Sequence, residues 1–155
     1  MAKMKNEIEI RVRLDDKKAT QKKLMDLGWT SEGIKFQREY TDCKPDKSCH
    51  KKEKNRRARE DGDSPKRILE KYRQTLSHPK NDVEIGIDSL PFGDYLEIEG
   101  SSRDIELIVP ELGLSEESRI TNAYWVVYSK YCAKQKVEED HNVVFGELVI
   151  TRPSK

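Results

Sequence analysis

Two pairs of glutamates are the side chains of this sequence best suited to metal chemistry. Glu7 and Glu9 form one pair, Glu97 and Glu99 form the other, and one hydrophobic residue separates the members of each pair. In a β-strand, residues at positions i and i+2 project from the same face roughly 7 Å apart, so one cation can lie between or beside them. Carboxylate oxygens suit Mg²⁺ or Mn²⁺ better than softer metals.

Basic residues continue this pattern at the same spacing. The pairs are Arg11 with Arg13, directly after the first glutamates, and then Arg57 with Arg59 and Lys71 with Arg73. Carboxylates can hold a metal ion while guanidinium groups bind phosphate oxygens, often through two hydrogen bonds at once. The sequence therefore predicts a site for a polyphosphate and its metal ion, such as inorganic triphosphate or a nucleoside triphosphate.

A simpler interpretation is that these charges only keep the outer faces of amphipathic strands in water. For one strand alone, this interpretation is the better one. Two strands with the same acidic pattern weaken it, because glutamate is depleted from strands and water-facing positions more often carry Thr, Lys or Ser.

Alternating hydrophobic residues predict the strands that would carry these groups. The clearest strand covers residues 7–14, where Ile8, Ile10, Val12 and Leu14 share one face and the charged residues share the other. Further strands are predicted at 34–41, 67–76, 83–87, 95–99 and 143–151, with a turn at 91–93 and a hairpin between 67–76 and 83–87. These strands outnumber the helices and lack the repeated spacing of a parallel sheet.

Three helices are predicted between the strands. The first begins after Asp15 or Asp16, directs Ala19, Leu24 and Leu27 inward and ends at Gly28. The second begins after Ser101 or Ser102 and is shortened by Pro110. The third covers about 122–134, with Tyr124, Val127, Tyr128 and Tyr131 on one side.

Composition favours a single domain over residues 1–155 with a polar segment at 43–66 that has the composition of a mobile loop. Thirty Lys and Arg oppose twenty-nine Asp and Glu, so no overall field attracts nucleic acid or a membrane surface. No apolar run approaches the ~18 residues of a membrane span, and we expect a cytoplasmic protein. Cys43, Cys49 and His50 lack the spacing of a usual zinc site.

Several motifs resemble those of a known family, the CYTH superfamily of triphosphate tunnel metalloenzymes. Residues 7–11, Glu-Ile-Glu-Ile-Arg, are similar to its ExExK signature, with Arg11 at the lysine position. The segments at 70–73, 83–85 and 88–100 are similar to later strands of bacterial members, and the LEIEG run with its preceding LPFG turn is the most specific match. Segments 112–114 and 120–124 follow in the same order.

The resemblance implies an α+β fold in which an antiparallel, tunnel-like β-barrel with a charged interior is flanked by helices. Segment 43–67 is too short for the strands that the family places there, so the tunnel would be incomplete or closed by a second subunit in a homodimer. On this basis the metal ligands for Mg²⁺ or Mn²⁺ would be Glu7, Glu9, Glu97 and Glu99, and the catalytic residues Glu9 and Arg11. The phosphate-binding residues would be Arg11, Arg13, Arg57, Arg59, Lys71 and Arg73.

Three functions remain open from the sequence. The first is metal-dependent binding and hydrolysis of inorganic, nucleoside or thiamine triphosphate. The second is a class IV type of adenylate cyclase, which makes cyclic AMP and pyrophosphate from ATP. The third is a non-catalytic binder of nucleotides or polyphosphate. In each case the expected partner is a small triphosphate or nucleotide, with no role for nucleic acid or a membrane.

Overall fold

One six-stranded antiparallel sheet with flanking helices forms the α+β fold, in a computed structural model that describes residues 7–42 and 66–146. The strands are β1 (Glu7–Leu14), β2 (Thr30–Asp42), β3 (Lys66–Ser77), β4 (Glu84–Leu90), β5 (Gly93–Ser101) and β6 (Arg119–Ile120). The helices are α1 (Lys17–Asp26), α4 (Ser102–Glu111) and α5 (Tyr124–Gln135), with a short 3-10 helix at Glu116–Ser118.

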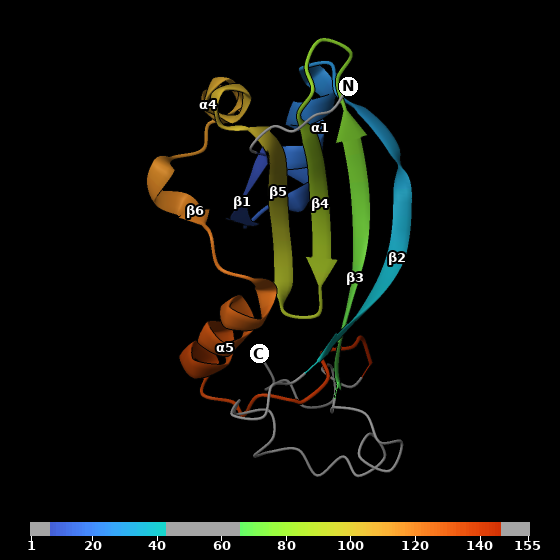
Figure 1. Cartoon of the computed structure of the whole chain (residues 1–155), viewed down its shortest axis with the longest axis vertical. Helices are drawn as coiled ribbons and strands as arrows, with labels where there is room; N and C mark the ends of the chain where they lie inside the picture. Colours follow the sequence, from blue (N-terminus) through green and yellow to red (C-terminus); the bar gives the residue numbers. More distant parts are fainter. Residues whose placement is uncertain (1–6, 43–65, 147–155) are drawn as a thin grey trace.

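The strand order β2-β3-β4-β5-β1-β6 leaves the sheet open within the described residues. The two edge strands, β2 and β6, do not pair with each other, and β2 bows away from the middle of the sheet (Figure 1). The expected antiparallel architecture is therefore confirmed in its incomplete form. The predicted hairpin between 67–76 and 83–87 is also confirmed, because β3 and β4 pair antiparallel.

One face of the sheet is apolar and is covered by α1 and α4. Alternation along the strands gathers a buried cluster on this face, with Ile10, Val12, Ile85, Ile87, Leu96 and Ile98 from the strands. Leu24 of α1 and Ile105 of α4 pack into the same cluster and are fully buried. Because successive side chains of a strand point to opposite faces, the charged residues between them must lie on the other face.

The predicted caps of α1 and α4 are present. Asp16 accepts a hydrogen bond from the backbone N–H of Ala19 at 3.1 Å, and Ser101 accepts one from Asp104 at 3.1 Å. The inward face predicted for α1 is wrong in part, because Ala19 and Leu27 are exposed. Ala19 lies about 140° around the helix from Leu24, and Leu27 follows the last helical residue.

Helix α5 packs at one end of the charged face, beside the turn between β4 and β5 (Figure 1). As predicted, Tyr124 and Tyr128 are buried, and Val127 and Tyr131 pack against the same cluster. The residues of the sheet in this cluster are Leu69, Leu90, Phe92 and Tyr95. The charged face is thus covered at one end by aromatic residues of α5.

Two predicted segments differ from the structure. Lys66 begins β3 instead of ending a loop, and residues 43–65 lie outside the described part of the chain. Of the strand expected at 143–151, the described residues 143–146 contain a single parallel bridge between Val143 and Leu69, and residues 144–146 are not strand. Residues 147–151 are not described. None of the described helices is long and apolar enough to cross a membrane.

Candidate functional site

The register between β1 and β5 brings the two glutamate pairs to the same face of the sheet. Glu9 lies opposite Glu99, and Arg11 lies opposite Glu97. On the other side of β5, Glu84 of β4 is also the partner of Glu99. Side chains directly opposite each other in an antiparallel pair have Cβ atoms roughly 5 Å apart. We call Glu9, Glu99 and Glu84, which lie side by side on three neighbouring strands, the acidic row.

Negative charge is crowded in the acidic row. Partial burial raises the pKa of Glu99, and the charges of Glu9, Glu84 and Glu7 raise it further. A divalent cation would relieve this repulsion. The described residues hold no preformed group of three or more His, Cys, Asp or Glu side chains for a metal ion. Mg²⁺ commonly takes only one or two carboxylates together with phosphate oxygens and water, and the hard donors of this row fit that pattern.

Arg11 connects the acidic row to Glu97. Its Nη2 donates to Glu9 Oε2 at 2.8 Å and to Glu97 Oε2 at 2.6 Å, while its Nε donates to the same Glu97 oxygen at 3.0 Å. Nη1 donates to the backbone carbonyl of Asn122, and the guanidinium lies 4.1 Å from the ring centroid of Tyr124. Burial by itself lowers the pKa of Arg11, but the hydrogen bond and charge of Glu97 outweigh it and raise that pKa above its usual value.

Arg73 reaches across β4 to join the same carboxylate. Its Nε and Nη2 each donate to one oxygen of Asp88 at 2.6 Å, and Nη2 also donates to Glu97 Oε1 at 2.5 Å. Gly86 lies between β3 and β5 at this level, and a Cβ atom there would be 2.9 Å from Arg73 Cζ. The missing side chain of Gly86 therefore provides the space that lets Arg73 reach Glu97.

Asp88 is fully buried and binds three donors. Besides Arg73, its Oδ2 lies 3.3 Å from Lys71 Nζ and accepts a hydrogen bond from the Tyr124 hydroxyl at 2.9 Å. Lys71 Nζ also lies 3.3 Å from a carboxylate oxygen of Glu39 on β2. Burial and the nearby charges of Asp88 and Glu97 raise the pKa of Tyr124, so this phenol remains a donor.

We call Arg11, Lys71, Arg73, Asp88 and Glu97 the central charge layer. Four of these side chains are buried and the fifth, that of Arg73, is 24% exposed, so the interpretation of them as simple water-facing charges is wrong. Each cation of the layer contacts at least one carboxylate. Glu7, Glu9 and Glu99 are exposed and remain compatible with the simpler interpretation.

Other expected site residues lie apart from this layer. Arg13 is exposed at the end of β1 and donates to the Tyr95 hydroxyl at 3.0 Å. Arg57 and Arg59 fall outside the described residues. Asp88 was not predicted as a site residue. The predicted strand at 83–87 ended one residue too early, and a strand that continued to Asp88 would have placed its side chain on the same face as Glu84. The assigned roles in metal and phosphate binding remain predictions.

Comparison with known proteins identifies the fold. The sequence matches no family model and no curated protein. The PH1012 protein from Pyrococcus horikoshii is structurally similar, with a TM-score of 0.61 and 17% identity over 77% of this chain and 97% of that one. A conserved hypothetical protein from Pyrococcus furiosus has a TM-score of 0.57 and 15% identity, over 77% of this chain and 98% of that one.

A third similar structure is from Vibrio parahaemolyticus and is described as a "putative adenylate cyclase". Its TM-score is 0.57 and its identity 14%, over 79% of this chain and 97% of that one. Likeness at this level of identity establishes a shared fold. That fold is consistent with the one that the CYTH resemblance implies.

Proposed function

We propose that this chain binds a triphosphate, either inorganic or attached to a nucleoside or thiamine, on the charged face of its sheet and hydrolyses it with Mg²⁺ or Mn²⁺. The observation that carries the proposal is the register of β1 and β5, which sets Glu9 beside Glu99 and Arg11 beside Glu97. The fold shared with the Vibrio protein, which is described as a "putative adenylate cyclase", supports a nucleotide or triphosphate as the ligand but does not favour hydrolysis over cyclisation.

Each group of the charged face has a part in this proposal. Glu9 and Glu99 hold the ion through carboxylate oxygens, as hard cations require. The bound ion supplies charge neutralisation and polarises the phosphorus under attack. Arg11 and Arg73 present planar donors that suit phosphate oxygens, and Lys71 adds a compact positive charge. Arg11, a member of the central charge layer, contacts Glu97 in that layer and Glu9 in the acidic row.

A second candidate function is cyclisation of ATP. The name of the Vibrio protein favours it. In this reaction the ribose 3′-hydroxyl attacks the α-phosphorus, a bond forms between them, and pyrophosphate leaves. The same metal and phosphate contacts serve both reactions, and the identity of the attacking oxygen separates them.

A third candidate is binding without turnover. The observation that favours it is that the sheet is open between its edge strands β2 and β6 within the described residues, so a complete tunnel around the ligand is missing there. Binding to one charged face needs fewer groups than hydrolysis, which also requires a positioned water.

One assay distinguishes the three functions. The purified protein is incubated with triphosphate or ATP plus Mg²⁺ or Mn²⁺, and phosphate, pyrophosphate and cyclic AMP are resolved. Phosphate as the product supports hydrolysis, and pyrophosphate with cyclic AMP supports cyclisation. Saturable binding without product, measured by calorimetry, supports the third function.

Variants of the glutamates test the location of the site. Glu9→Gln and Glu99→Gln each replace a carboxylate by a neutral amide, and we expect at least about a tenfold weaker response to the metal ion, since hard cations bind amides less well. Glu111→Gln is the matched control, because Glu111 is exposed on α4, which covers the opposite face. If Glu9→Gln and Glu99→Gln retain the parent's metal dependence, the site is wrongly placed.

A further inference from the structure

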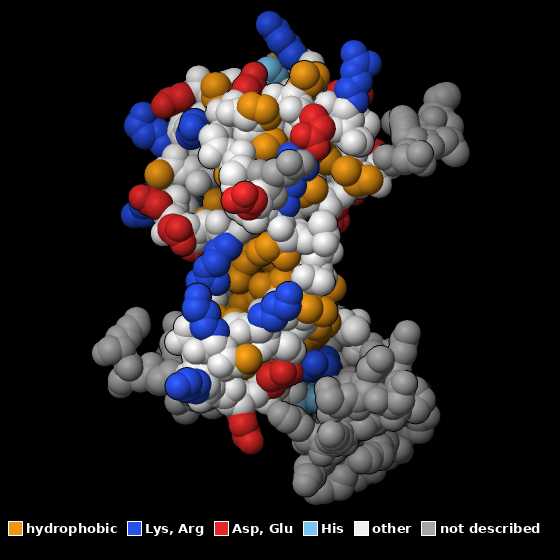
Figure 2. Space-filling model, turned by 90° about the vertical axis from the view of Figure 1, so that its left-hand side faces the viewer, with side chains coloured by type: hydrophobic (Ala, Val, Ile, Leu, Met, Phe, Trp, Pro, Cys, Tyr) orange, Lys and Arg blue, Asp and Glu red, His pale blue; other side chains and the backbone are white. Residues whose placement is uncertain are grey.

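A cavity lies between β6, the end of β1 and α5. Its volume is about 440 Å³, which is within the range of small-molecule sites. Figure 2 shows this side of the molecule as a hollow with hydrophobic side chains at its floor and Lys and Arg side chains around it. Arg13, Lys130 and Lys134 line the cavity, and none of the described residues that line it is Asp or Glu.

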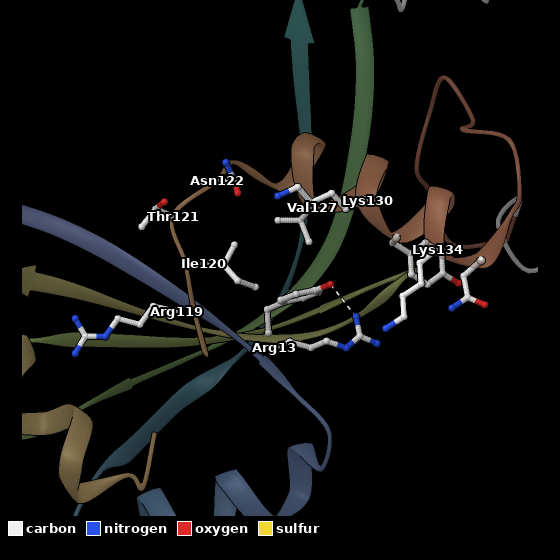
Figure 3. A pocket seen from close by; sticks show the side chains of 11 residues that line it. Arg13, Arg119, Ile120, Thr121, Asn122, Val127, Lys130 and Lys134 are labelled. Atoms are coloured by element: carbon white, nitrogen blue, oxygen red, sulfur yellow. Dashed lines mark hydrogen bonds between the residues drawn. The ribbon is translucent and has the colours of Figure 1, made fainter. Parts of the chain in front are cut away.

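These three cations differ from those of the central charge layer in their partners. Within the described residues, Arg13 donates to the neutral hydroxyl of Tyr95, and no carboxylate pairs with Lys130 or Lys134. Figure 3 shows Arg13 and Lys134 extending toward each other from β1 and α5. Lys130 and Lys134 are also one turn apart on α5, a spacing at which like charges destabilise a helix. An anion between these groups would remove that repulsion.

The floor of the cavity is suited to an apolar or aromatic group. Ile120 and Val127 contribute aliphatic surface, and Tyr131 contributes an aromatic ring. The fourth cation in the lining, Arg119, is bound by Glu106 through two hydrogen bonds at 2.9 and 3.0 Å. The cavity therefore combines an apolar floor with three cations that have no carboxylate partner among the residues that the structure describes.

We infer that this cavity binds a phosphate ester whose organic part is aromatic or apolar, without a metal ion. Arg13, Lys130 and Lys134 supply three positive charges, enough to neutralise the two negative charges of a phosphate dianion, and the floor of Ile120, Val127 and Tyr131 receives the organic part. Metal independence follows from the described part of the lining, which offers no carboxylate to hold a cation. The inference does not depend on turnover at the acidic row.

Calorimetric titration in the presence of EDTA tests this inference, with AMP, adenosine and inorganic phosphate as probes. AMP is expected to bind at least about tenfold more tightly than either of the other two, because only AMP engages both the cations and the floor. Phosphate that binds as tightly as AMP would refute the role of the floor. Absence of AMP binding in EDTA would refute the site as a whole.

A double variant places the binding in this cavity. Lys130→Ala with Lys134→Ala should weaken AMP binding about tenfold or more, since two charge-assisted contacts are lost. The control is Lys18→Ala with Lys80→Ala, which removes two exposed lysines outside the cavity and should bind AMP like the parent. If the double variant Lys130→Ala with Lys134→Ala binds AMP as tightly as the parent does, the inference is overturned. AMP binding that requires Mg²⁺ and is lost in Glu99→Gln would instead belong to the acidic row, which also overturns it.

Discussion

Replacement of Asp88 by Asn tests the central charge layer directly. The Asp88 side chain is fully buried, accepts two hydrogen bonds from Arg73 and one from Tyr124, and lies 3.3 Å from Lys71. Asparagine keeps the shape of the side chain but removes its charge and replaces one acceptor oxygen by a donor NH₂ group. Arg73 and Lys71 would then lose their shared counter-ion in a buried setting.

The free energy of unfolding that Asp88→Asn should remove can be estimated from the other contacts of Arg73 and from its exposure. Removing one partner of a buried ion pair costs about 3–5 kcal/mol, because the other charge is left uncompensated. Arg73 keeps its contact with Glu97 and its side chain is 24% exposed, so the lower end applies. We therefore expect Asp88→Asn to lower the free energy of unfolding by about 3 kcal/mol, a large share of the ~5–15 kcal/mol of a typical domain.

Urea unfolding followed by circular dichroism measures this difference. Combining Asp88→Asn with Arg73→Leu gives a double-mutant cycle, and the double variant should lose less stability than the sum of the two single changes. Glu106→Gln is the control. Glu106 forms an ion pair with Arg119, but its side chain is exposed, so this substitution should leave the midpoint of urea unfolding close to the parent's. If Asp88→Asn unfolds at the same urea concentration as the parent, the buried ion pairs do not support the fold as argued.

Two further predictions concern the same face. Gly86→Ala places a Cβ atom 2.9 Å from Arg73 Nε and Cζ, so it should force Arg73 away from Glu97. We expect it to lower the free energy of unfolding, measured in urea, by about 1–3 kcal/mol. Unchanged stability would mean that the Arg73 side chain can cross β4 by another path. Glu99→Gln should stabilise the protein at pH 7. The raised pKa of Glu99 means that its ionisation opposes folding as the pH rises above the ordinary value of 4.5, so the gain in melting temperature should disappear below that pH.

The faces of β1 and β5 could be predicted because their hydrophobic residues alternate without interruption. Once Ile8, Ile10 and Val12 define one face, Glu9 and Arg11 must share the other. The caps at Asp16 and Ser101 could likewise be predicted, since each depends on a side chain and an N–H group only three residues apart.

The partners of these charges could not be predicted in the same way. Which strands are neighbours, and in which register, depends on contacts between distant parts of the chain, and a shift by one residue would exchange the faces. Arg73 meets Glu97 only because β4 lies between their strands and carries Gly86 at the crossing point. Asp88 was missed because Ser89 interrupts the hydrophobic alternation that Ile85 and Ile87 establish.

The pairing of each cation of the central charge layer with a carboxylate makes these carboxylates internal competitors for any incoming anion. A solute that approaches Arg73 must displace Asp88, which already satisfies the guanidinium through two short hydrogen bonds. Chloride has one charge and no planar pair of acceptors, so it cannot replace the two hydrogen bonds that Asp88 makes with Arg73. The central charge layer is therefore selective. It favours ligands of high charge density that arrive with a cation, because the cation can bind the carboxylates that the ligand displaces.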